Sequence, residues 1–289
     1  MSLIICLSMG LNLNTPAREV TATEPSTVSG VKDIDKMVED CIKNCIDSAF
    51  SMENVAEVID NFVKKNKGDD ESWSIEVIDL RTGQQTGYME DLSQTAASSV
   101  KLFVAGAIME NLESVEERYP ADVVERLMRA MLVISDNESS SELIAMLGNG
   151  STDEGKSVVN DYCTKYGYDD TYIGILFSGV DPTGEYNITS AGDTAMFLQD
   201  IYNNELPGSE TILDLMKASE RLEKIPAALP GNVTSANKSG ELDNTSNDSA
   251  IVFASHPFVL SILLDDIEFF RAGELIRELT EEVLPLFEQ

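Results

Sequence analysis

The chain is poor in the residues that build metal centres and histidine-dependent sites. It has one histidine, His256, and four cysteines, at positions 6, 41, 45 and 163, which have neither the spacing of metal ligands nor the density of a disulfide scaffold. We therefore expect no metal and no cofactor. The pattern G-x-S-x-G is also missing, and the proline after His256 favours an extended backbone there, which disfavours a hydrolase built on serine and histidine.

Basic residues and long apolar runs are scarce as well. Lys and Arg number 20 against 51 Asp and Glu, giving a formal net charge of −31, which repels nucleic acid and anionic lipid. The start, "MSLIICLSMGL", is too short to span a bilayer, and a stretch rich in Thr, Ser, Pro and Glu follows it. We expect residues 1–30 to be a signal remnant or a flexible tether, residues 31–289 to fold as one domain, and the mature body to lack an integral membrane segment.

Hydrophobic periodicity predicts strands near both ends of the chain and helices between them. Residues 33–65 have the pattern of an amphipathic helix, and 72–80 and 84–90 of strands. Helical patterns dominate the middle, before strands at 233–242, 249–255 and 258–266 and a final helix at 269–287. The order predicts an α/β (α+β) fold in which both chain ends build one antiparallel sheet flanked by helices, next to an all-helical lobe.

The stretch "TAASSVKLFVAGAIMENL", residues 95–112, places Ser98 and Lys101 at the start of an apolar helix. Residues three apart share a helix face, whereas Ser99 points elsewhere. The free N–H groups and dipole of a first helical turn favour negative charge and disfavour a protonated lysine. We interpret Ser98 as a nucleophile whose proton passes to a neutral Lys101.

Two further short motifs follow in the chain. "SDN" at 135–137 comes after an apolar run and before a helical pattern, so Ser135 and Asn137 are expected at a helix junction. "KSG" at 238–240 lies inside a predicted strand and offers a lysine and a small hydroxyl beside a glycine that lets a substrate approach the backbone. Together the three motifs supply the nucleophile, base, leaving-group donor and oxyanion donors that acyl transfer needs.

With these motifs the chain resembles the class A β-lactamases and penicillin-binding proteins, whose pattern is S-x-x-K, S-D-N and K-T-G. "RLEKIPAALPGN" and the final helix also look like class A counterparts. The resemblance covers roughly residues 33–289 and implies a serine hydrolase of the β-lactamase/transpeptidase-like fold. It assigns roles to the residues of the three motifs: Ser98 as acylated nucleophile, Lys101 as its base, Ser135 as proton relay, Asn137 as substrate-amide contact, Lys238 and Ser239 as carboxylate anchors, and the N–H groups of Ser98 and of Glu241, after Gly240, as oxyanion hole.

The chain departs from this pattern in the loop after "YGYDD". The family's E-x-x-x-N sequence, in which a glutamate activates the deacylating water, is missing there, and Glu185 in "GEYN" is the nearest candidate. Ser239 replaces the family's threonine and keeps the hydroxyl. The segment between Ser98 and Ser135 is shorter than is usual in class A, which predicts a more open cleft. We expect acylation to be retained and deacylation to be slow.

The substrate and the compartment stay open at this stage. The expected partner is a small β-lactam or a cell-wall peptide, and the alternatives are a D-alanyl peptidase or esterase, or a sensor of the penicillin-binding fold that acylates without turnover. N-x-S/T sequons at Asn137 and Asn237 overlap the motifs, and glycans there would block the site. We therefore expect a bacterial protein exported to the periplasm, cell surface or medium, with antibiotic resistance as one expected role, although a cytoplasmic location is compatible with the sequence.

Overall fold

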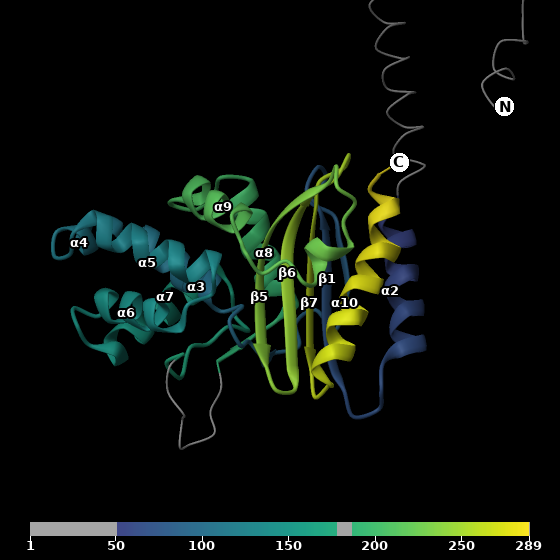
Figure 1. The fold of residues 1–289 in the computed structure, drawn as a ribbon, viewed down its shortest axis with the longest axis horizontal. Helices are drawn as coiled ribbons and strands as arrows, with labels where there is room; N and C mark the ends of the chain where they lie inside the picture. The colour runs from purple at the N-terminus through teal and green to yellow at the C-terminus, as the bar shows by residue number, and fades with distance from the viewer. Residues whose placement is uncertain (1–50, 178–186, 289) are drawn as a thin grey trace, which may run out of the picture. The chain divides into compact units, whose positions relative to one another are not determined.

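A five-stranded antiparallel sheet forms the centre of the fold. The computed structural model describes residues 51–177 and 187–288. Within them the strand order is β2-β1-β7-β6-β5, so a hairpin from the N-terminal side pairs with three strands from the C-terminal side (Figure 1). The strands are β1 (Ser72–Asp79), β2 (Gln85–Tyr88), β5 (Thr234–Leu242), β6 (Thr245–Phe253) and β7 (Phe258–Asp265). Strand β5 lies at one edge of this sheet.

Two helices cover one face of the sheet. They are α2 (Met52–Asn66) and α10 (Phe269–Val283), which lie side by side in Figure 1. Alternate residues of β1, among them Trp73, Ile75 and Val77, are buried in the same cluster as the apolar faces of these helices. This alternation is expected of a strand whose two faces meet different layers.

The other face of the sheet meets helix α8 and, beyond it, a helical lobe (Figure 1). These helices are α3 (Lys101–Glu110), α4 (Leu112–Glu116), α5 (Ala121–Val133), α6 (Asn137–Leu147), α7 (Thr152–Tyr166), α8 (Ala191–Tyr202) and α9 (Ser209–Lys217). Short elements complete the described part: β3 (Gln94–Thr95) paired with β4 (Ile188–Thr189), and the 3-10 turns η1 (Ile225–Ala228) and η2 (Leu284–Leu286).

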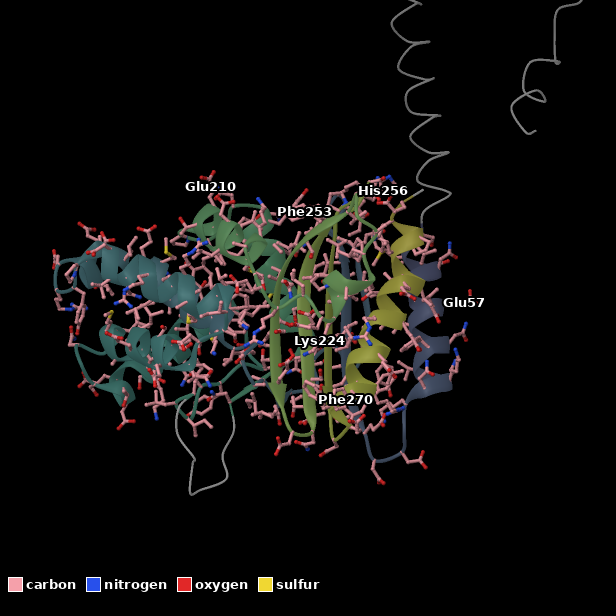
Figure 2. All side chains as sticks on the ribbon, in the orientation of Figure 1. Glu57, Glu210, Lys224, Phe253, His256 and Phe270 are labelled. Atoms are coloured by element: carbon pink, nitrogen blue, oxygen red, sulfur yellow. The ribbon has the colours of Figure 1, made fainter. Side chains whose placement is uncertain are left out.

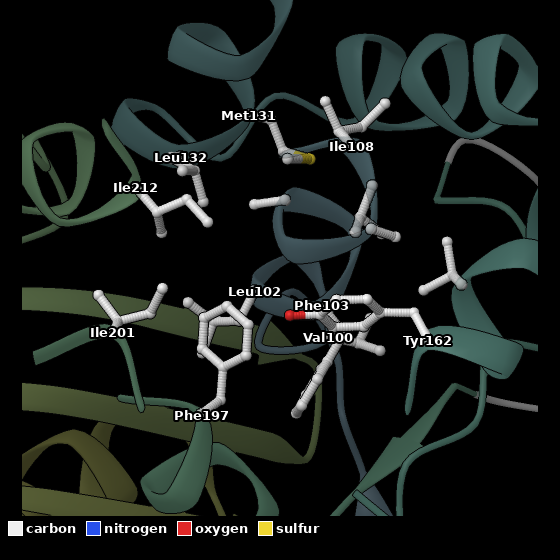
Figure 3. Close-up of a cluster of buried hydrophobic side chains, with 14 of the residues drawn as sticks. Val100, Leu102, Phe103, Ile108, Met131, Leu132, Tyr162, Phe197, Ile201 and Ile212 are labelled. Atoms are coloured by element: carbon white, nitrogen blue, oxygen red, sulfur yellow. The ribbon is translucent and has the colours of Figure 1, made fainter. Parts of the chain in front are cut away.

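Helix α3 runs through the core of the helical lobe. All residues from 101 to 108 are buried, which explains why its sequence is apolar on every side. Figure 3 shows side chains of α3 packed among those of the surrounding helices. Phe103 contacts Phe197 edge-on with ring centroids 5.4 Å apart, and Tyr168 with centroids 5.1 Å apart. The start of α3 is thus fixed by a rigid core.

The predicted fold class is confirmed, with differences at element boundaries. Strand β6 begins at Thr245, four residues before the predicted start, because its first half is polar yet buried and lacks an apolar pattern. The helix predicted over 33–65 is described only from Met52 onward. In the described part of the chain, no helix has the length and apolar character that crossing a membrane requires.

Strand β1 carries a buried carboxyl group, that of Glu76, without a hydrogen-bond partner among the described residues. Glu76 is 2% exposed, and neither of its carboxyl oxygens has a hydrogen-bond partner among the described residues. A Cβ on Gly87 of β2 would come within 2.4 Å of its Oε2, so Gly87 leaves room for the carboxyl group. Burial, followed by the charges of Glu90 and Asp91, raises the pKa of Glu76 to about 8.

The raised pKa of Glu76 predicts that the protein loses stability as the pH rises from about 4.5 to about 8. Between about pH 4.5 and 8 the unfolded chain holds Glu76 ionised while the folded protein keeps it protonated, so the free energy of unfolding falls as pH rises to about 8. Glu76→Gln should remove this dependence and raise that free energy at pH 8.5 by a few kcal/mol, since a pKa difference of one corresponds to about 1.4 kcal/mol. Urea denaturation at pH 5 and 8.5 measures it, with the exposed Glu57→Gln on α2 as control (Figure 2). Equal effects of both substitutions at both pH values would contradict the prediction.

Candidate active site

Ser98 lies in a tight turn that leads into α3. The helix itself begins at Lys101, so Ser98 precedes the helix and is not part of its first turn as expected from the sequence. Ala97 has φ 47°, and a bond from Lys101 N to Ser98 O of 3.2 Å is one of several i→i+3 bonds at this entry. Side chains three apart eclipse each other in such 3-10 geometry, so Ser98 and Lys101 still share a face. No side-chain hydrogen bond between the two is observed in the described structure, and bonds of this kind often form only once a substrate is bound.

The second motif forms the junction between α5 and α6. Ser135 has φ 63°, a left-handed conformation that is uncommon for serine and marks local strain. Asp136 then caps α6, accepting a hydrogen bond from Ser139 N at 2.7 Å, and Asn137 is the first helical residue. The strained residue and the cap together direct Ser135 and Asn137 toward Lys101.

The Lys101 amine binds both polar residues of this junction. Its Nζ donates to Ser135 O and to Asn137 Oδ1, each at 2.7 Å, and lies 3.4 Å from Ser135 Oγ. The side chain is fully buried. Burial lowers the pKa of Lys101 to about 7, the charge of Asp136 opposes this shift, and that of Arg221 adds to it. An amine with this pKa is suited to accept a proton near neutral pH.

The third motif reaches the same serine from the edge strand β5. Lys238 Nζ donates to Ser135 Oγ at 2.9 Å and to Ser239 O at 2.6 Å. Ser135 Oγ therefore lies between two lysine amines that come from different layers of the fold. Burial, then the charge of Lys101, holds the pKa of Lys238 well below its usual value, with Asp248 acting in the opposite direction.

Gly240 brings the third motif against the turn that carries Ser98. A Cβ on Gly240 would lie 2.8 Å from Ala96 O and 2.9 Å from Ser98 N, so only glycine allows this approach. Glu241, the next residue, has an exposed side chain. Gly240, which precedes Glu241, thus lies against the backbone of Ser98, and the oxyanion role of the Ser98 and Glu241 N–H groups stays a prediction.

Buried polar residues behind β5 hold this arrangement, and the sequence analysis missed them. Lys224, labelled in Figure 2, donates to Asn247 O at 3.0 Å and pairs with Glu241 Oε1 at 3.0 Å. Asn247 in turn donates to Thr95 O and Ala96 O at 3.0 and 3.1 Å. Lys224 lies in the quoted "RLEKIPAALPGN", but nothing in one sequence signals that its amine binds the strands β5 and β6 that follow.

The loop before α8 is described only in part. Glu185 lies outside the described residues, so its role stays a prediction. The described part brings Phe177 to the Lys101 amine, with 4.9 Å between Nζ and the ring centroid. Among the described residues, no group of three His, Cys, Asp or Glu side chains is placed to hold a metal ion.

Comparison with known proteins gives the family of the chain. The model of the β-lactamase enzyme family matches residues 116–287, more than half of the chain, and includes the second and third motifs but not Ser98 and Lys101. The chain therefore belongs to the β-lactamase enzyme family. A search of curated proteins found no match.

Solved structures share the fold at low identity. The chain is similar to PBP-A, with a TM-score of 0.70 and 21% identity over 80% of this chain and 96% of that one. It is similar to an ancestral class A β-lactamase (GNCA), with a TM-score of 0.68 and 20% identity over 80% and 99%. A β-lactamase from Xanthomonas campestris gives 0.66 and 18% over 80% and 96%. These likenesses support the β-lactamase-like fold, and the chain is a β-lactamase-like serine hydrolase by family.

Proposed function

We propose that this protein is a serine acyl hydrolase that forms an acyl-enzyme on Ser98 with β-lactam amides and releases the product slowly. The position of Ser135 Oγ, within 3.4 Å of Lys101 Nζ and 2.9 Å of Lys238 Nζ, is the observation that best supports it. A hydroxyl between two amines whose pKa values are lowered provides a path for a proton from the nucleophile to a leaving nitrogen.

The acylation step follows from these positions. Ser98 Oγ bonds to the carbonyl carbon of the β-lactam as its proton passes to the neutral Lys101. The C–N bond of the ring then breaks, and the nitrogen receives a proton through Ser135. The backbone N–H groups of Ser98 and Glu241 would bind the oxyanion, Asn137 the substrate amide, and Lys238 with Ser239 the substrate carboxylate.

Slow release is proposed because the loop before α8 offers no family-type glutamate. An acyl ester reacts with water only if a base takes the proton, and a positioned base contributes about 10²- to 10⁴-fold. Acylation retains its own base in Lys101. A mutant of PBP-A has been solved as an acyl-enzyme complex with penicillin G, so a protein of this fold forms the proposed intermediate.

A chromogenic cephalosporin tests this function. Mixing it with the enzyme should give a burst near one equivalent followed by a slow steady rate. Glu185→Gln should leave the steady rate unchanged if Glu185 is a surface residue and lower it if Glu185 activates the water. Burst-free rapid turnover that Glu185→Gln does not affect would contradict slow release.

Two other functions use the same residues. A D-alanyl peptidase or esterase would share the acylation chemistry and differ in substrate, and a sensor would stop after the burst. We favour the β-lactam reaction because of the family membership, and we propose a bacterial, exported location in which such substrates are met. Continued hydrolysis of a D-alanyl ester, with acylation by this ester faster than by the cephalosporin, would favour the peptidase or esterase.

A further inference from the structure

The ring of Phe177 covers the amine of Lys101. The distance from Nζ to the ring centroid is 4.9 Å, within the range of a cation–π contact. Such a contact favours the charged amine, whereas burial favours the neutral one, and the pKa of about 7 shows that burial dominates. The ring of Phe177 is one of the groups next to the buried amine, and on its side of Nζ it offers water no strong hydrogen-bond partner.

The polar neighbours of the Lys101 amine are Ser135 and Asn137. Nζ donates to Ser135 O and to Asn137 Oδ1, and Ser135 Oγ lies farther away at 3.4 Å. These oxygens and the ring cannot occupy the same side of the nitrogen. Because the lysine side chain is fully buried, the ring closes a side of it that the polar partners leave open.

The backbone at residues 173–175, just before Phe177, is held by two asparagine side chains. Asn187 Oδ1 accepts bonds from Gly174 N and Ile175 N, both at 3.0 Å, and Asn160 Oδ1 accepts one from Ile173 N at 2.8 Å. Asn187 O also accepts a bond from Ala96 N at 2.8 Å, two residues before Ser98. The segment below Phe177 is thus tied both to α7 and to the turn of the nucleophile.

We propose that Phe177 sets the lifetime of the acyl-enzyme by excluding the deacylating water from the side of Lys101 that its ring covers. This inference rests on the proposed function. In deacylation the water oxygen bonds to the acyl carbon, the bond from that carbon to Ser98 Oγ breaks, one water proton goes to a base, and Ser98 Oγ recovers a proton. An apolar ring beside the amine neither admits this water nor accepts its proton, so the ester persists.

Variants at position 177 distinguish the effect of admitting water from the effect of adding a base. Phe177→Leu keeps an apolar side chain and should retain a long-lived adduct with penicillin G. Phe177→Gln admits water without a base and should shorten the lifetime several-fold. Phe177→Glu adds a carboxylate next to Lys101. Its adduct lifetime should be about tenfold or more shorter than that of Phe177→Gln, because a placed base can supply about 10²- to 10⁴-fold in rate. Intact-protein mass spectrometry after removal of free penicillin gives each lifetime.

A second readout tests the shielding without any β-lactam. Labelling of the Lys101 amine by acetic anhydride across a pH series reports its pKa, which should rise above about 7 in Phe177→Gln as water reaches the amine. Tyr172→Ala, which removes an exposed ring earlier in the same loop, is the control and should change neither readout.

The outcomes separate the two proposals. Rapid acylation with equal adduct lifetimes in the wild type, Gln and Glu variants would overturn the role of Phe177 and leave the proposed function intact. No adduct in any variant would contradict the proposed function, and amine labelling alone would then decide whether Phe177 shields Lys101. An unchanged labelling profile in Phe177→Gln would overturn the shielding.

Discussion

Ser98→Ala should abolish covalent labelling by a penicillin probe, while Ser99→Ala should retain it. Ser98 lies three residues before Lys101 and beside Gly240, and the proposed function makes its hydroxyl the nucleophile with Lys101 as base. Ser99 is fully buried, and its Oγ has no hydrogen-bond partner among the described residues. Removing an unpaired buried hydroxyl costs little stability, which makes Ser99→Ala a matched control.

Gel fluorescence with a labelled penicillin and peptide mapping measure this pair. Both variants should fold, which thermal unfolding verifies. Full labelling of the Ser98→Ala variant at another residue would contradict the assignment of Ser98 as the nucleophile. Loss of labelling in both variants with unchanged folding would mean that the turn before α3 matters as a whole.

The second large effect concerns the base. Lys101→Ala should slow acylation by about 10²- to 10⁴-fold on every substrate, because it removes the proton acceptor. In the wild type the acylation rate should rise with pH and level off above about 7, since Lys101 must lose its proton before it can accept one. One pH unit below the midpoint, the neutral fraction and hence the rate should be about tenfold below the plateau.

Lys238→Ala provides the contrast. Burial holds the pKa of its amine well below the usual value, and a bound carboxylate would favour the charged form. The variant should weaken substrates that carry a carboxylate and spare neutral esters, which have no such charge. Stopped-flow acylation of a penicillin and of a neutral phenyl ester compares the two. Equal losses on both substrates from both lysine variants would contradict separate roles.

The sequence was informative where function depends on local spacing. The i, i+3 relation of Ser98 and Lys101 survives in the turn, although the helix begins later than expected. The junction at Ser135 follows from the capping preference of Asp136 and was predicted from the helical pattern after it. Both sheet halves were recognised because strand and turn patterns are local.

Other parts of the site depend on contacts between distant segments. Lys224 and Asn247 act through backbone carbonyls of another element, and no residue pattern encodes such a contact. Phe177 belongs to a short apolar run inside a loop, which in one sequence cannot be distinguished from a residue that packs on the core. The same holds for the start of β6, where buried polar residues hide the strand pattern.

The most direct test of the account is a time course of intact-protein mass spectrometry with penicillin G. The wild type should gain the full mass of one penicillin within the first measurement, with the adduct on the peptide that contains Ser98, and should retain it long after free penicillin is removed. A protein that never gains this mass, or that loses it as fast as it forms while hydrolysing penicillin, would contradict the claim of a Ser98 acyl-enzyme with slow release.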